Sequence, residues 1–113
     1  MKGKIMTDCV VVLVTCKSSA EARRIGVAMV TRRVAACANV FPGKIESIYR
    51  WRGKIERARE TLLLLKTTRR RWPKLRDAIR RLHGYEVPEI VALPIAAGLA
   101  EYLDWVGESV KSE

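Results

Sequence analysis

The chain has 113 residues, and its 22 Lys and Arg against 12 Asp and Glu give it a formal net charge of +10. This length fits a single domain over residues 1–113, with a core over about 9–106, and leaves no room for two domains. No run of 18 or more apolar residues occurs, so a transmembrane helix is excluded. Met1–Ile5 carries two lysines, but Thr7 and Asp8 interrupt the apolar stretch that follows. We therefore expect no targeting segment and a cytoplasmic location.

The cysteines are Cys9, Cys16 and Cys37, an odd number without a CxxC pair. This pattern excludes both a disulfide framework and a zinc-knuckle spacing. Each cysteine lies in or beside an apolar run, so we expect buried free thiols.

The first predicted elements are a strand and a helix. Residues 9–16 are apolar or β-branched at nearly every position, which predicts a strand buried on both faces. Ser18, with Glu21 three residues later, predicts a capping box at the start of a helix. Apolar residues at helical spacing extend this amphipathic helix to about Arg33.

A long hairpin is predicted next, with arms over residues 34–50 and 55–67 and a tight turn at Trp51–Lys54. Pro42-Gly43 in the first arm predicts a kink or bulge, because proline cannot donate to the hydrogen-bond ladder. Arms of roughly 12–15 residues exceed the usual strand of about 5–6, so this hairpin must project beyond its own sheet.

The last predicted elements are a helix, a strand and a helix. Thr68 is expected to cap the helix that ends at Gly84. Residues 86–95 are bracketed by two prolines, which predicts an edge strand. A third amphipathic helix follows Gly98.

This order of elements predicts an α/β (α+β) fold, a ferredoxin-like βαββαβ sandwich with a C-terminal helix added. The first two helices then cover one face of the sheet, whereas residues 9–16 and Leu62–Leu65 are apolar on both faces. Leaving such side chains exposed costs about 1.5–3 kcal/mol each. Because a single third helix is narrow against four strands, we expect other copies of the chain to cover this face.

Several unusual motifs follow one another without a large gap between about residue 9 and residue 106. They are Val14-Thr15-Cys16, Arg33–Val40, Ser47–Glu56, Leu64–Thr67, Leu82–Ile90, Leu93–Ile95 and Tyr102–Trp105. Together they resemble the CutA family of divalent-cation tolerance proteins. The resemblance implies a ferredoxin-like protomer, a tight homotrimer with the architecture of PII-type signalling proteins, and a link to copper and other divalent cations. It implies no settled catalytic activity, and we expect a homeostatic or signalling role.

Two positions depart from the family's pattern. The common turn His-Pro-Tyr is His83-Gly84-Tyr85 here, and glycine loosens a turn that proline stiffens. Some metal-binding members have a cysteine where this chain has Val14. The available thiol is Cys16, which lies on the same strand face because the side-chain period of a strand is two residues.

Cys16 and His83 are the predicted ligands of weakly bound copper or a similar divalent ion. Copper(I) prefers thiolates, and copper(II) prefers imidazole and oxygen ligands. His83 is the only histidine, so a site of several imidazoles within one chain is excluded. Cys37, Glu86 and Glu89 are further candidates, but the two glutamates lie three residues apart in a predicted strand and should point to opposite faces. The alternative role for His83 is contact with the last carbonyls of its helix.

A second candidate site is a cleft between subunits with Trp51, Glu60, Lys66, Tyr85 and Glu86. The ligand there would be a small molecule, an anion or a metabolite. Lys66 ends a run of four leucines and needs a partner such as Glu60 or Glu86. The alternative is a salt bridge at the trimer interface.

An enzyme is not predicted, because the glycines form no phosphate loop and no serine nucleophile has a nearby base. The alternative function is a basic nucleic-acid-binding module. Seven cations on or near the second helix favour it: Arg69, Arg70, Arg71, Lys74, Arg76, Arg80 and Arg81. However, no stacking aromatic residues interleave these cations, and the open strands carry leucine and valine instead. We therefore favour a solvated basic face and expect neither nucleic acid nor membrane as a partner.

Overall fold

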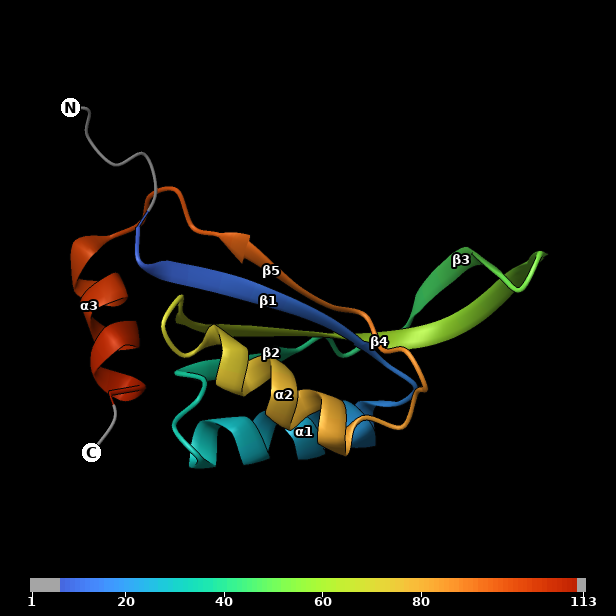
Figure 1. Ribbon diagram of the computed structural model, residues 1–113, viewed down its shortest axis with the longest axis horizontal. Helices are drawn as coiled ribbons and strands as arrows, with labels where there is room; N and C mark the ends of the chain where they lie inside the picture. The colour runs from blue at the N-terminus through green and yellow to red at the C-terminus, as the bar shows by residue number, and fades with distance from the viewer. Residues whose placement is uncertain (1–6, 112–113) are drawn as a thin grey trace.

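Two helices lie on one face of an antiparallel sheet in the computed structural model, which describes residues 7–111 (Figure 1). The elements are β1 (Cys9–Cys16), α1 (Ser19–Thr31), β2 (Cys37–Val40), β3 (Ile45–Trp51), β4 (Lys54–Thr68), α2 (Trp72–Leu82), β5 (Ile90–Pro94) and α3 (Ala100–Ser109). The strand order is β2-β4-β1-β5, and β3 pairs with the rest of β4. This is the predicted ferredoxin-like arrangement with an added C-terminal helix.

Within the described part of the chain, no helix is both long and apolar enough to cross a membrane. The stretch Met1–Ile5, for which we predict no targeting segment, lies outside the described residues.

The main core lies between the sheet and helices α1 and α2. Alternate side chains of β1 point toward the helices, and Val12, Val14 and Cys16 are fully buried there. They pack against residues from the facing helices and from β4, among them Ile25, Met29, Leu63, Leu65, Leu75 and Ile79. β1 is central because it pairs with β4 on one side and β5 on the other.

The hairpin is confirmed, with its first arm divided into two strands. β2 and β3 both pair with β4, and the chain bends at Pro42-Gly43, where proline cannot continue the ladder. At the tip, Arg52 and Gly53 have φ of 52° and 80°. Positive φ at both central residues is the geometry of the two-residue turn that matches strand twist. The β3–β4 arm therefore extends beyond the sheet (Figure 1).

Two predicted element boundaries are wrong. Thr68 is not the N-cap of α2, because it is the last residue of β4 and pairs with Cys9, although its hydroxyl accepts a hydrogen bond from the Arg71 N–H at 3.3 Å in the turn before the helix. The helix begins at Trp72 after Arg71, which makes no side-chain capping bond. The last strand begins at Ile90 rather than Glu86, so residues 86–89 form a loop. This loop contains Pro88, which cannot donate to the sheet.

The face of the sheet away from α1 and α2 is apolar, as the sequence predicts. Leu13 lies between Leu64 and Val91 on this face, and Val11 pairs with Leu93. Val91 and Leu93 are 44% and 46% exposed. Helix α3 covers only one end of the face, where Val106 and Val110 pack on Cys9 and Ala36. Most of this face is therefore covered by no helix of the described chain.

Candidate functional site

Cys16, Glu21 and His83 form a buried cluster, and one possible ligand atom from each lies within 4.8 Å of the others. Three elements bring them together: Cys16 ends β1, Glu21 lies in the first turn of α1, and His83 follows the last residue of α2. Both predicted metal ligands are therefore placed in one cluster. Glu21 is the additional residue.

The His83 ring is held by two backbone groups. Its Nδ1 accepts a hydrogen bond from the Tyr85 N–H at 3.1 Å, so Nε2 carries the proton and donates to the Thr15 carbonyl at 2.8 Å. The ring thus contacts β1, whereas the last turn of α2 is bonded through the His83 backbone N–H, which donates to the Ile79 carbonyl at 2.9 Å. The alternative role for His83 was a contact of its ring with the last carbonyls of its helix, and the ring bonds to the Thr15 carbonyl instead.

Glu21 is held in place by backbone donors from two directions. Its Oε1 accepts from the Lys17 N–H at 3.0 Å and its Oε2 from the Gly84 N–H at 2.9 Å. Burial favours the neutral acid, but these two bonds and the nearby His83 and Lys17 outweigh it, so the pKa of Glu21 lies below its ordinary value. Glu21 is therefore a carboxylate at neutral pH.

Only half of the predicted capping box forms. The Ser18 hydroxyl accepts from the Glu21 N–H at 3.1 Å, as predicted. The Glu21 carboxylate instead bonds to Lys17, because Gly84 holds its other oxygen on the side of the α2–β5 loop.

The Cys16 thiol is protonated at neutral pH. Burial, together with the negative charges of Glu21 and Glu60, raises its pKa to about 12. Any metal ion that binds Cys16 as a thiolate must therefore displace a proton.

The donor set of this cluster fits a divalent ion of borderline or soft character. Thiolate, imidazole and carboxylate are ligands that copper and zinc accept. The His83 Nδ1 lies 4.0 Å from Glu21 Oε2, so Nδ1 is the ring nitrogen that could share a metal ion with this carboxylate. The Nε2–H bond to Thr15 is the kind of outer contact that orients a metal-binding histidine.

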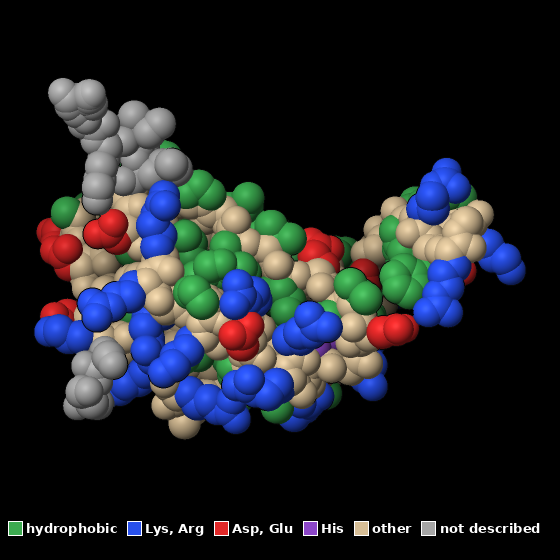
Figure 2. Space-filling view, in the orientation of Figure 1, with side chains coloured by type: hydrophobic (Ala, Val, Ile, Leu, Met, Phe, Trp, Pro, Cys, Tyr) green, Lys and Arg blue, Asp and Glu red, His purple; other side chains and the backbone are tan. Residues whose placement is uncertain are grey.

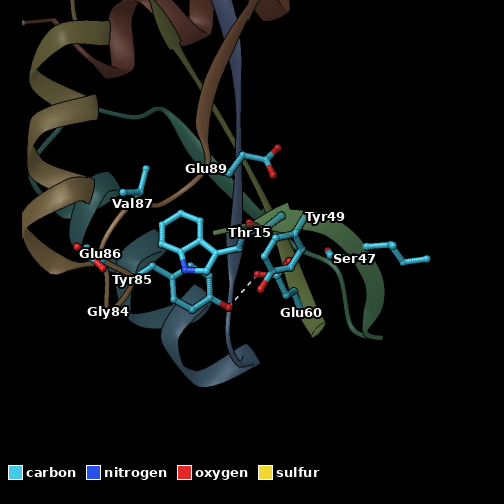
Figure 3. Close-up of a pocket in the computed structure, with 11 residues that line it drawn as sticks. Thr15, Ser47, Tyr49, Glu60, Gly84, Tyr85, Glu86, Val87 and Glu89 are labelled. Carbon is cyan, nitrogen blue, oxygen red and sulfur yellow. Dashed lines mark hydrogen bonds between the residues drawn. The ribbon is translucent and has the colours of Figure 1, made fainter. Parts of the chain in front are cut away.

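A pocket of about 710 Å³ lies between the base of the β3–β4 arm and the α2–β5 loop (Figure 3). The residues around it are Thr15, Ser47, Ile48, Tyr49, Trp51, Glu60, Gly84, Tyr85, Glu86, Val87 and Glu89. Four of the five predicted cleft residues are among them. Figure 3 shows the Tyr85 hydroxyl pointing toward Glu60, to which it donates a hydrogen bond of 2.8 Å.

Lys66 is the predicted cleft residue that does not line this pocket. Its ammonium group donates to the side-chain oxygen of Asn39 at 2.6 Å, so the predicted partners Glu60 and Glu86 are wrong within one chain. Glu60 lies six residues away on the same strand, which corresponds to about 20 Å.

Two other expectations about ligands change. Glu86 and Glu89 do not point to opposite faces of a strand, because they lie in the loop before β5 and both line the pocket. Cys37 lies apart from the cluster, since its sulfur is 3.6 Å from the hydroxyl of Tyr102 in α3.

The cations of α2 lie on the outer side of the molecule. Figure 2 shows Lys and Arg side chains along the lower edge, where α1 and α2 lie in Figure 1. Arg76 pairs with Asp77 at 2.9 Å and lies over the Trp72 ring, with 5.9 Å from its guanidinium carbon to the ring centroid. No aromatic ring other than Trp72 lies on α2, so the described basic surface lacks the stacking platform of an RNA-binding sheet.

The sequence profile of the CutA1 divalent ion tolerance protein family matches residues 10–109. The chain belongs to this family. It is 54% identical over 99 residues to the divalent-cation tolerance protein CutA of Thermus thermophilus, covering 88% of this chain and 95% of that protein. It is 44% identical over 99 residues to human Protein CutA, of which it spans 55%, and that stretch is 88% of this chain.

Solved structures of CutA1 proteins have the same fold. The structure of the Thermus thermophilus protein matches with a TM-score of 0.88 at 51% identity, covering 91% of this chain and 99% of that one. CutA of Xylella fastidiosa matches with a TM-score of 0.89 at 35% identity, covering 93% and 100%. The family profile, over residues 10–109, includes both the Cys16–Glu21–His83 cluster and the pocket.

Glu21 and Tyr49 are site residues of this CutA1 chain that the sequence did not single out, and Glu89 was considered as a metal ligand but not as a residue of the pocket. The capping motif accounted for Glu21, and nothing local showed that Gly84, 63 positions away, would bind it. Tyr49 gave no signal beyond the loose alternation of side chains along its strand. Glu89 was predicted to lie in the last strand, but that strand begins one residue later, at Ile90.

Proposed function

We propose that this CutA1 family member binds copper or a similar divalent ion at Cys16, Glu21 and His83, in a homeostatic or signalling role rather than a catalytic one. The observation that carries the proposal is the convergence of three ligand types from three elements within 4.8 Å, all of them buried. The names of the relatives in Thermus thermophilus and Archaeoglobus fulgidus describe those proteins as acting in divalent-cation tolerance.

A bound ion would supply a positive charge to a site that already contains one carboxylate. Cys16 would lose its thiol proton, which burial and the negative charges of Glu21 and Glu60 otherwise retain by raising its pKa. His83 would offer Nδ1 after releasing the Tyr85 N–H, while Nε2–H keeps its bond to Thr15. These exchanges oppose binding, which agrees with the expectation of a weak site.

We also propose a homotrimer that works in the cytoplasm. The apolar sheet face, with Val91 and Leu93 exposed in a single chain, supports an assembly that covers it. Cys9, Cys16 and Cys37 are free thiols, as is usual in a reducing compartment. The pocket beside Tyr85 supports a small-molecule ligand as part of this function.

Copper titration against a competing chelator tests the metal site. We expect Cys16→Ser, Glu21→Gln and His83→Ala to weaken binding by at least the roughly 10–100-fold that losing an outer-shell partner costs. Affinity should also rise about tenfold per pH unit between pH 6 and 8, because binding releases the Cys16 proton.

Cys37→Ser is the matched control, since Cys37 is a free thiol outside the cluster. It should leave both the affinity and the pH slope unchanged. Unaltered copper binding in correctly folded Cys16→Ser and His83→Ala proteins would show that the ligands are assigned wrongly.

A further inference from the structure

The pocket beside Tyr85 has a lining opposite in sign to the rest of the chain. Three carboxylates line it, from Glu60, Glu86 and Glu89, and none of its lining residues is Lys or Arg. The chain as a whole carries a net charge of +10. A pocket that collects three of the twelve acidic residues in such a chain repels anions and attracts cations.

Glu60 is the innermost of these carboxylates, and no Lys or Arg among residues 7–111 forms an ion pair with it. It is 6% exposed, and the bond it receives in the described chain comes from the neutral hydroxyl of Tyr85. Burial and the adjacent Glu60 raise the pKa of Tyr85, so this hydroxyl remains a donor. One neutral donor leaves most of the acceptor capacity of this carboxylate open toward the pocket.

Aromatic rings complete the pocket. Tyr49, Trp51 and Tyr85 line it together with the carboxylates. The faces of aromatic rings attract cations, most strongly when the cation has lost its water. A small hydrated metal ion makes no use of such rings, whereas an organic cation contacts them with its apolar part.

The chain itself shows this recognition at the edge of the pocket. The guanidinium carbon of Arg52 lies 5.2 Å from the centroid of the Trp51 ring, and an Arg52 nitrogen lies 3.4 Å from Glu86. Trp51 and Glu86 therefore already hold a cationic group between them. Glu60, deeper in the pocket, has no such cationic group within the part of the chain that the structure describes.

We propose that the pocket binds a small organic cation, an amine or guanidinium compound with an apolar body. Its charged end bonds to Glu60, and its body lies against Tyr49, Trp51 and Tyr85. This replaces the anion considered from the sequence, because Lys66, the one Lys or Arg among the predicted cleft residues, lies outside the pocket. The inference rests on the small-molecule part of the proposed function, and its test requires no bound metal ion.

Three probes of similar shape and different charge test the inference on the full chain: 2-phenylethylamine, 2-phenylethanol and 3-phenylpropanoate. Calorimetric titration at neutral pH should show the amine binding at least about tenfold more tightly than the alcohol, with no binding of the carboxylate. Glu60→Gln should remove this preference, because it keeps the size of the side chain and loses its charge.

Glu46→Gln is the matched control, since Glu46 lies on β3, is exposed and does not line the pocket. Its amine affinity should equal that of the wild type. A Trp51→Leu protein, which keeps all carboxylates, should bind the amine more weakly than the wild type.

The outcomes separate two failures. Equal binding of the amine and the alcohol, or tighter binding of the carboxylate, would overturn the cation assignment and leave a small-molecule site. No binding of any probe would overturn both this inference and the small-molecule part of the proposed function, while the copper titration stands by itself.

Discussion

Glu21 shows how a single buried side chain can serve both folding and ligand chemistry. Its two oxygens accept backbone N–H groups of Lys17 and Gly84, which joins the start of α1 to the end of α2. The same carboxylate contributes to the cluster with Cys16 and His83. Its charge is therefore required for stability even without a bound ion.

We expect Glu21 to make the stability of the protein sensitive to acid. Its pKa is lower in the folded chain than its ordinary value of 4.5, so the stabilisation is complete above that pH. It is lost as the pH falls through the folded pKa, where the carboxylate must take up a proton. Urea unfolding between pH 2.5 and 7 should show this fall in the free energy of unfolding.

The Glu21→Gln protein should be less stable at neutral pH by about 1–3 kcal/mol, because charge-assisted bonds are lost. It should also lose less stability in acid than the wild type does. Glu46→Gln, at an exposed position, controls for the change in net charge. A parallel acid profile for the wild type and Glu21→Gln would contradict this account.

At this scale the sequence predicted two of the three cluster residues. Cys16 was identified because the family resemblance implied a metal and Cys16 shares a strand face with Val14, and His83 because it is the only histidine. Glu21 was missed because its contact with Gly84 depends on the packing of α1 against the α2–β5 loop, which no local pattern reveals.

The turn after α2 is the element on which both candidate sites depend. Three successive residues of this turn make bonds to three different elements: His83 to β1, Gly84 to α1 and Tyr85 to β4. The Gly84 N–H is available because this position is not the proline that the resemblance to the family's His-Pro-Tyr turn implies. The exchange thus provides one of the two backbone donors to Glu21.

We expect Gly84→Pro to destabilise the protein. His83 has φ −78° and ψ 141°, which suits a residue before proline, so the backbone itself does not oppose the change. Proline gains about 0.4–1 kcal/mol through the unfolded state but removes a charge-assisted bond worth about 1.5–3 kcal/mol. Its ring also occupies the space of the N–H and displaces the Glu21 carboxylate.

Thermal and urea unfolding check this prediction. Gly84→Ala is the control that retains the N–H, although its Cβ would lie 3.1 Å from Glu21 Oε2. It should fall between the wild type and Gly84→Pro. A proline variant more stable than the wild type would show that the bond to Glu21 contributes little.

Elements were predictable where the signal is local. The break at Pro42 and the turn at Gly53 follow from the backbone chemistry of those two residues. Thr68 was predicted to cap a helix rather than to end a strand. Its strand pairing is with Cys9, a residue far away in the chain, so no local pattern indicates it. The start of the last strand was missed because it is set by pairing with β1. Ile90 pairs with Val14, and Glu89 does not continue the ladder.

The exposed apolar sheet face is the feature that concerns the whole molecule. The sequence predicted it from strands that are apolar on both faces. The surface that covers this face belongs to another copy of the chain, so the sequence of one chain does not identify it. The side chains of Val11, Leu13, Leu64, Val91 and Leu93 form the continuous patch.

We expect Leu93→Lys to break the assembly. Leu93 is 46% exposed in a single chain, so the substitution costs the fold of one chain little and places a charge within the covered face. Sedimentation analysis should give a mass of three 12.8 kDa chains for the wild type and a smaller mass for the variant. Val27→Lys, at an exposed position of α1, should remain a trimer. A wild-type monomer would remove the basis of the proposed assembly.

Tyr85 connects the metal-ligand cluster with the pocket. Its N–H donates to Nδ1 of His83, and its O–H donates to the carboxylate of Glu60. An ion that takes Nδ1 of His83 releases the backbone of the residue that holds the innermost pocket carboxylate. Occupancy of the two sites is then thermodynamically linked, and each ligand changes the affinity of the other by the same factor. The amine titration repeated with and without copper measures that factor, and a value of one would mean that the two sites respond to their ligands separately.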